Sequence, residues 1–445
     1  SVSRISPHGS LLYSHEYLNY DEWGRLKEEK HLGFVGHKKK EWSLGNQLIS
    51  VESEYYKEHV PHNGYDALGH LLSLQREGDF NPQDLSFTYN FLSQITSENG
   101  ESDKTYSFDS IGNRITKNNE RYQYDHLNQL VKTSQDQYEY DPRGCLTKRS
   151  RNDVDWNFES NVMGQLIRIA KEDNTALEFS YDPFGRLLTK KHFDVSGKYK
   201  KKLSIARYLY VGDQEIALLE ESGEISELCV PGIHNNALGQ ESVAFEIRGK
   251  TLAPLFDKRG NVVALIDPQW REVVESYTYS SFGECKIFDA YGEELEESAL
   301  ANSWTFSGKR KDSETGFFLF SLRFYDPVIG RWISPDPALF IDGPNLYAFA
   351  QNNPLHYLDR FGLSTENRNS EEFENYFYGE VESHCFCERH RTCKRGGDLG
   401  NMSLTYGLES YFVNSFESFE SPFTNKSKIY DLSAESLFQE LPKGM

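Results

Sequence analysis

Arg323, Asp336 and Asp359 are the residues of this sequence whose types best suit cleavage of a peptide bond. Two carboxylates brought together in a water-poor site cannot both ionise, so one keeps a proton and the other acts as a base. Such a pair activates water against a nearby peptide bond, as in aspartic proteases. An arginine within reach orients one carboxylate through a forked contact. Ordinary turn chemistry is the competing interpretation of both aspartates.

A second group of reactive residues lies in the C-terminal tail, where cysteines and histidines crowd together. Thiolates and imidazoles at such spacings can ligate zinc, so a zinc site in the tail is one prediction. The spacing is not one of the common zinc signatures, and free thiols or a disulfide are the alternatives. The residues concerned are His384, Cys385, Cys387, His390 and Cys393.

The same region contains a basic patch, Arg389–Arg395, within an acidic tail. Such a patch can contact nucleic-acid phosphate, and His384 or His390 with Asp398 could supply acid–base catalysis for a metal-free nuclease. A solvated surface is the alternative. No P-loop, G-x-S-x-G or H-E-x-x-H motif is present, so NTPase, serine hydrolase and zincin functions have no support.

The elements that must position these residues are repeats of Tyr/Phe-Asp-x-x-Gly-x-Leu, which fill roughly the first 290 residues. Each unit predicts a strand, a tight turn and a strand. The aspartate bonds its own downstream backbone, the glycine supplies a positive φ and the leucine returns to the apolar face. Asn128 replaces one glycine, and asparagine also accepts the left-handed conformation. Stacked hairpins of this kind pair into a continuous sheet. The clearest units begin at Tyr20, Tyr65, Phe108, Tyr124, Tyr140, Tyr181 and Phe256.

The stretch 306–363 has denser turn signals than the repeats. Its first half alternates aromatic and polar residues, which predicts paired strands with one buried face. Asp326, Gly330 and Asp336 then mark turns. We expect one short helix over 345–351, ended by the Asn-Asn-Pro that follows. So many turn-forming residues in one stretch predict a structure that closes the repeat body.

Several motifs in this stretch resemble the core of RHS-repeat proteins. These are the YD-repeat shells of bacterial polymorphic toxins and Tc-toxin C components, with relatives in animal teneurins. The resemblance implies an all-β fold in which the hairpins wind into a hollow shell. The matching motifs are Arg-Phe-Tyr-Asp-Pro at 323–327, Gly-Arg-Trp-Ile-Ser-Pro-Asp-Pro at 330–337, Asn-Leu-Tyr at 345–347, Asn-Asn-Pro at 352–354 and Asp-x-x-Gly-Leu at 359–363.

In RHS cores, matching positions are linked to self-cleavage after the Gly-Leu pair, here between Leu363 and Ser364. The resemblance therefore implies that the arginine and the two aspartates named above form an aspartic autoprotease. Arg360 departs from the family pattern, which usually has proline there. We expect this change to loosen the strand that presents the bond, and the guanidinium to disfavour a shared proton on Asp359.

Composition limits the other functions of the chain. A net charge of −20 argues against nucleic-acid binding by the shell, because phosphate would be repelled. No run of about 18 apolar residues is present, so we expect no membrane-spanning segment. Cys145, Cys229 and Cys285 are expected to be buried small hydrophobes, and no cofactor is expected for the shell.

Three parts are expected along the chain. Residues 1–305 form an N-terminally truncated repeat shell, 306–363 form the core that closes it, and 364–445 form a variable, mixed or α-rich module. By resemblance, the shell encloses and delivers this module, often a toxin, in a secreted or cell-surface bacterial protein. The implied partners are a secretion or translocation apparatus and, for a toxic module, an immunity protein. The alternative is a non-enzymatic adhesion or carbohydrate-binding surface protein with an inert tail.

Overall fold

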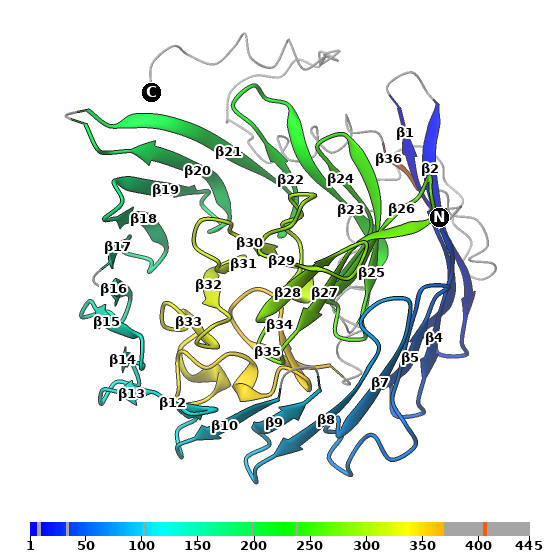
Figure 1. Cartoon of the computed structure of the whole chain (residues 1–445), viewed down its shortest axis with the longest axis horizontal. Coiled ribbons are helices and arrows are strands. Elements are labelled where there is room, and N and C mark those ends of the chain that lie inside the picture. The colour runs from blue at the N-terminus through cyan, green and yellow to red at the C-terminus, as the bar shows by residue number, and fades with distance from the viewer. Residues whose placement is uncertain are drawn as a thin grey trace, which may run out of the picture.

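A computed structural model describes residues 1–6, 10–32, 35–100, 103–152, 154–197, 199–236, 239–368 and 404–406. In this part of the chain, strands form sheets of 13, 17, 4 and 2 strands (Figure 1). The predicted all-β fold is confirmed. No helix among these residues has the length and apolar character needed to cross a membrane. Most of the expected module at 364–445 lies outside the described residues.

The 13-stranded sheet carries the first repeats, and strands that follow one another along the chain pair antiparallel. β36 joins its edge in parallel with β1. The sheet consists of β1 (Val2–Ile5), β2 (Leu11–Tyr20), β3 (Leu26–His31), β4 (Gly36–Trp42), β5 (Leu48–Glu52), β6 (Tyr56–His59), β7 (Ser73–Gly78), β8 (Gln83–Tyr89), β9 (Ile95–Asn99), β10 (Lys104–Phe108), β11 (Arg114–Lys117), β12 (Glu120–Arg121) and β36 (Leu404–Tyr406).

The 17-stranded sheet continues the same antiparallel order. It consists of β13 (Gln123–Tyr124), β14 (Leu130–Lys132), β15 (Asp136–Tyr140), β16 (Leu146–Arg151), β17 (Val154–Ser160), β18 (Leu166–Lys171), β19 (Thr175–Tyr181), β20 (Leu187–Asp194), β21 (Lys201–Val211), β22 (Gln214–Leu219), β23 (Ile225–Asn236), β24 (Gly239–Ile247), β25 (Lys250–Phe256), β26 (Val262–Asp267), β27 (Glu272–Tyr279), β28 (Cys285–Asp289) and β29 (Glu294–Leu295).

The repeat turns have the chemistry that their residues predict. In the unit that begins at Tyr140, Asp141 Oδ1 accepts the N–H groups two and four residues further on, both at 2.9 Å. Gly144 has φ +90°, and Asn128 in the preceding unit has φ +63°. Leu146 is buried and pairs across the hairpin with Tyr140. The aspartates of the repeats are therefore turn residues, as expected.

The structure adds a unit at Tyr89, with Asn90 and Ser93 in the aspartate and glycine positions. The tyrosine that starts a unit also connects it to the unit before. Its hydroxyl donates a hydrogen bond to the backbone carbonyl of the last residue of the preceding unit. This bond adds to strand pairing and fixes the register of successive hairpins. It joins Tyr89 to Leu71 at 2.7 Å, Tyr124 to Arg114 at 2.8 Å, Tyr181 to Leu166 at 2.6 Å and Tyr279 to Val262 at 2.7 Å.

The stretch 306–368, which we call the core segment, lies inside the curve of the two large sheets (Figure 1). It begins with the 3-10 turn η1 (Phe306–Gly308) and continues as a four-stranded sheet, two further 3-10 turns and a terminal hairpin. These elements are β30 (Arg310–Lys311), β31 (Phe318–Phe320), β32 (Arg323–Asp326), β33 (Arg331–Trp332), η2 (Leu339–Asp342), η3 (Ala350–Asn352), β34 (Tyr357–Asp359) and β35 (Thr365–Asn367).

Two layers of apolar contacts hold the core segment in place. One is its own aromatic cluster, and the other packs against the inner face of the 17-stranded sheet. Burial of such large side chains is the main favourable term in folding. The first layer comprises Phe306, Phe318, Phe320, Tyr325, Trp332 and Phe349, and the second comprises Phe317, Phe324, Ile329 and Ile333.

Polar contacts then join the core segment to the turns of five successive repeat units. Each time, a side chain of the core segment donates to the backbone carbonyl of the fifth residue of a unit. The pairs are His356 Nδ1 to Gly69 at 3.3 Å, Asn353 Nδ2 to Ser93 at 2.7 Å, Asn352 Nδ2 to Gly112 at 2.8 Å, Arg331 Nη2 to Asn128 at 2.6 Å and Tyr347 Oη to Gly144 at 2.8 Å.

The helix expected over 345–351 is wrong. The segment instead contains an isolated bridge from Ala348 to Arg331 and the single 3-10 turn η3. A regular helix rotates each successive side chain by about 100°, whereas Tyr347, Asn352 and the following asparagine all have to reach the same row of shell turns. The contacts with the shell therefore override the local helical pattern.

Replacing Gly144 with alanine should destabilise the chain more than replacing Gly24. Both glycines occupy the fifth position of a unit with positive φ, so each change should cost about 1–2 kcal/mol of backbone strain. At Gly144 the new Cβ would also lie 2.4 Å from Tyr347 Oη, while at Gly24 nothing lies within 4 Å. The displaced hydrogen bond should add about 1–3 kcal/mol.

Thermal unfolding followed by circular dichroism would compare Gly144→Ala with Gly24→Ala. A clearly lower midpoint for Gly144→Ala is expected. Equal midpoints would show that the turn carbonyl contacts add little to the stability of the core segment.

Candidate functional site

The core segment brings together the three residues that the sequence singled out. Arg323 begins β32, Asp336 lies in the turn that follows β33, and Asp359 ends β34. The Asp-Pro turn is set by Asp336 itself, whose Oδ1 accepts the N–H of Ala338 at 2.8 Å. All three side chains are nearly inaccessible to solvent, with relative exposures of 3%, 6% and 1%.

One guanidinium nitrogen bridges the two carboxylates. Arg323 Nη2 lies 2.7 Å from Asp336 Oδ2 and 3.2 Å from Asp359 Oδ2. Arg323 Nε donates to the backbone carbonyl of Gly362 at 2.6 Å. The guanidinium carbon lies 4.1 Å from the centroid of the Trp332 ring, which shields one face. The arginine thus joins both acids to the loop that precedes Leu363.

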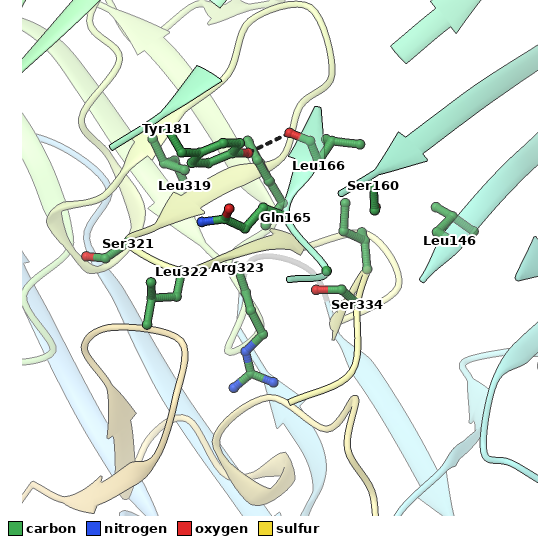
Figure 2. A pocket seen from close by; sticks show the side chains of 13 residues that line it. Leu146, Ser160, Gln165, Leu166, Tyr181, Leu319, Ser321, Leu322, Arg323 and Ser334 are labelled. Atoms are coloured by element: carbon green, nitrogen blue, oxygen red, sulfur yellow. Dashed lines mark hydrogen bonds between the residues drawn. The ribbon is translucent and has the colours of Figure 1, made fainter. Parts of the chain in front are cut away.

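Figure 2 shows a small pocket beside the strand that carries Arg323, which is one of the residues that line it. A pocket of only about 10 Å³ lies there among Leu166, Tyr181 and Leu322. The Arg323 guanidinium extends away from the bonded pair of Tyr181 and Leu166. A pocket of this size holds a water molecule at most, so the chemistry of this region belongs to the carboxylate side.

The second carboxylate shapes the loop that contains the Leu363–Ser364 bond. β34 and β35 pair with Asp359 opposite Thr365, so the bond lies in the connecting loop of this hairpin. Asp359 Oδ1 accepts the backbone N–H of Gly362 at 2.7 Å and of Leu363 at 3.1 Å. The loop is therefore wrapped around one oxygen of Asp359 while the other oxygen faces Arg323.

Burial has the largest effect on the pKa values of Asp336 and Asp359. It raises the pKa of Asp359 to about 6, against the lowering effects of Arg323 and the two backbone N–H groups. Burial also raises the pKa of Asp336 above its ordinary value, with Arg323 again opposing. Asp359 is thus protonated below about pH 6, and the arrangement can hold one proton on two acids.

Arg360 is directed elsewhere. Its Nε lies 3.4 Å from Glu366 Oε2 across the hairpin. The influences that set the pKa of Asp359 are burial, Arg323, the backbone N–H groups of the loop and Asp342. We expected the Arg360 guanidinium to act on Asp359, and the structure pairs it with Glu366 instead.

Comparison with known proteins finds relatives of the chain among YD-shell proteins and toxin subunits. The model described as Teneurin YD-shell matches residues 46–210. Toxin subunit YenC2 of Yersinia entomophaga is 46% identical over 59 residues, or 13% of this chain and 6% of YenC2. Toxin subunit YenC1 of the same organism is 29% identical over 150 residues, or 34% of this chain and 15% of YenC1.

A solved structure shares the fold. The crystal structure of TcdB2-TccC3 without its hypervariable C-terminal region superposes with a TM-score of 0.50 and 18% identity, covering 81% of this chain and 21% of that chain. The chain is an RHS-type YD-shell protein. It spans 6% and 15% of the two curated relatives above, a small part of each.

Metal-binding residues of this YD-shell protein remain a prediction. The five tail residues, His384, Cys385, Cys387, His390 and Cys393, lie outside the described residues. Within the described part, no three His, Cys, Asp or Glu side chains are arranged to hold a metal ion. The free thiols of Cys145 and Cys229 are buried in the shell, as expected, whereas Cys285, also expected to be buried, is only partly buried.

Sequence reasoning missed one acidic residue of the YD-shell core. Asp342, at the end of η2, accepts the N–H of Thr365 with both carboxylate oxygens, at 3.0 and 2.9 Å. No motif marks it, because it lies in the connection between the Asp-Pro turn and Asn345, outside the matching motifs. An acidic residue directly before Gly343 was the only available signal.

Stability of the YD-shell chain should depend on the proton of Asp359. Its folded pKa, about 6, lies above its ordinary value of 3.8, so the folded state binds the proton more tightly. The group therefore favours folding below about pH 4 and loses this contribution as the pH rises through 6. In an Asp336→Asn background, which avoids the expected self-cleavage, the chain with Asp359 should lose stability between pH 4 and pH 7 relative to the chain that also carries Asp359→Asn.

Unfolding midpoints in denaturant for the two chains, measured at pH 4 and pH 7, test this expectation. The difference between them isolates Asp359, because the other titrating groups are common to both chains. A difference that stays constant with pH would contradict a raised pKa.

Proposed function

We propose that this chain is part of a toxin-delivery shell whose core segment cleaves the chain between Leu363 and Ser364. The observation that carries the proposal is the shared guanidinium of Arg323. It bonds two buried carboxylates and, through Nε, the carbonyl of the residue directly before Leu363. An isolated turn aspartate has no need of such a buried, bridged partner.

The proposed reaction is hydrolysis by an acid–base pair. A water molecule attacks the carbonyl carbon of Leu363 while the ionised carboxylate accepts one of its protons. The protonated carboxyl group gives its proton to the nitrogen of Ser364, and the C–N bond breaks. The products are a carboxyl group on Leu363 and an amine on Ser364. Asp359, which keeps its proton up to about pH 6, is the better donor, and Asp336 is the base.

Arg323 has two roles in this scheme. Its positive charge keeps one of the two acids ionised inside the core. Its bond to the Gly362 carbonyl holds the loop against the carboxylates, and the Trp332 ring limits the movement of the guanidinium. Holding the reacting bond near the catalytic groups supplies much of the rate in such reactions.

The names of its relatives support the proposed role of the whole protein. YenC1 and YenC2 carry the name of toxin subunits, and the solved TccC3 shell is described with a hypervariable C-terminal region. On this proposal the shell encloses residues 364–445 as an effector and acts at the cell surface or after secretion. Its partners are a translocation or secretion apparatus and, for a toxic effector, an immunity protein.

Intact mass of the denatured chain tests the cleavage. Wild type should give two fragments separated after Leu363. Asp336→Asn and Asp359→Asn should each lower the rate by a factor of about 10²–10⁴, because each removes one acid–base group. Both variants should remain as one chain on the time scale of purification.

Asp326→Asn is the matched control. Asp326 is an equally buried aspartate of the same core segment with a raised pKa, but it faces Arg149 at 3.5 Å instead of Arg323. It should cleave as wild type does. An unbroken wild-type chain would refute self-cleavage, and cleavage that survives in both site variants would refute the aspartate mechanism.

A further inference from the structure

We infer that Asp342 is a positioning residue for this cleavage, holding the peptide group downstream of the Leu363–Ser364 bond as Asp359 holds the one upstream. This inference rests on the proposed function and adds a third carboxylate to it. Hydrogen bonds hold the backbone on both sides of the Leu363–Ser364 bond.

The upstream side is fixed by Asp359 and Arg323. Asp359 Oδ1 accepts the N–H of Leu363 at 3.1 Å, which belongs to the peptide group between Gly362 and Leu363. Arg323 Nε bonds the carbonyl of that same peptide group at 2.6 Å. The N–H and the carbonyl of this peptide group are therefore both hydrogen-bonded.

The downstream side is fixed by Asp342. Both of its oxygens accept the N–H of Thr365, which belongs to the peptide group between Ser364 and Thr365. Gln351 Nε2 adds a bond to the Thr365 hydroxyl at 2.8 Å. The Leu363–Ser364 peptide group, which is cleaved, lies between these two hydrogen-bonded peptide groups. A carboxylate from each side thus sets its position.

The strand that follows is anchored independently of the cleaved bond. β35 pairs with β34, and the buried Arg368 donates to the carbonyls of Arg259 at 2.9 Å and Tyr357 at 3.3 Å. Asp342 therefore has a fixed strand to act on. After hydrolysis, the new amine of Ser364 is formed one residue from this carboxylate, which can hold it as a cation.

Asp342 also affects the charge of the acid pair. Its carboxylate raises the pKa of both Asp336 and Asp359, because a nearby negative charge disfavours their ionised forms. A purely structural residue would stabilise the loop without changing the pH at which the pair titrates. This difference makes the two roles separable by experiment.

The experiment measures the first-order cleavage rate of the full chain after pulse labelling in cell-free synthesis, across pH 4–9. Asp342→Ala should slow cleavage by a factor of about 10–100, because small misplacements of a reacting bond cost this much. Asp342→Asn keeps one acceptor oxygen and the side-chain shape, so most of the rate at the optimum should return. Its pH profile should shift toward lower pH because the charge is gone.

Gln351→Ala is the matched control, since it removes a contact to the Thr365 side chain and leaves the backbone contact intact; it should change the rate less than threefold. Thermal midpoints of the Asp342 variants, measured in the Asp336→Asn background, identify a variant that fails to fold. If Asp342→Ala fails to fold, the pH profile of Asp342→Asn distinguishes a positioning role from a purely structural one. Wild-type rates and an unshifted profile in the Asp342 variants would overturn this assignment and leave the proposed function intact. A wild-type chain that stays whole would overturn both.

Discussion

The backbone carbonyls of the repeat turns are the groups on which the rest of this structure depends. Each of these turns has a left-handed residue in its fifth position, and the carbonyl of that residue accepts a hydrogen bond from the core segment. Five consecutive units present these carbonyls in a row, and one continuous stretch of the core segment donates to all of them. A buried carbonyl left without a donor would cost about 1–3 kcal/mol, so the shell and the core segment have to be built together.

This arrangement also explains why the turn glycines have two functions, one in the backbone conformation and one in the contact with the core segment. Gly144 supplies the positive φ, and its missing side chain leaves room for the hydroxyl of Tyr347. Gly112 is approached in the same way by Asn352. Asn128 keeps the left-handed backbone without being a glycine, and there the partner is the longer Arg331, which reaches the carbonyl from further away.

The candidate site follows from the same anchoring. Its strands and turns meet in the short sheet β30–β33, the hairpin β34–β35 and the aromatic cluster of the core segment. Contacts with the shell on either side hold them at fixed positions, so a single guanidinium can meet two acids from distant parts of the segment. Burial then raises the pKa values of both acids. The contacts that hold the core segment against the two sheets thus also bury the two acids and raise their pKa values.

The sequence by itself determined everything that depends on neighbouring residues. The turn chemistry of the repeats, the left-handed Asn128 and the buried leucines follow from residue types within one seven-residue unit. The motifs around Arg323 and Asp359 marked three residues that the structure brings together. Tertiary structure decided the rest. The segment 345–351 is not helical because its side chains must meet one row of shell turns, and Arg360 meets Glu366 because they face each other across a hairpin. Asp342 lies beside the Leu363–Ser364 loop only in the folded chain, since two short turns and a hairpin bring it to Thr365. Hydrogen bonds between residues far apart in the sequence cannot be predicted from the types of neighbouring residues.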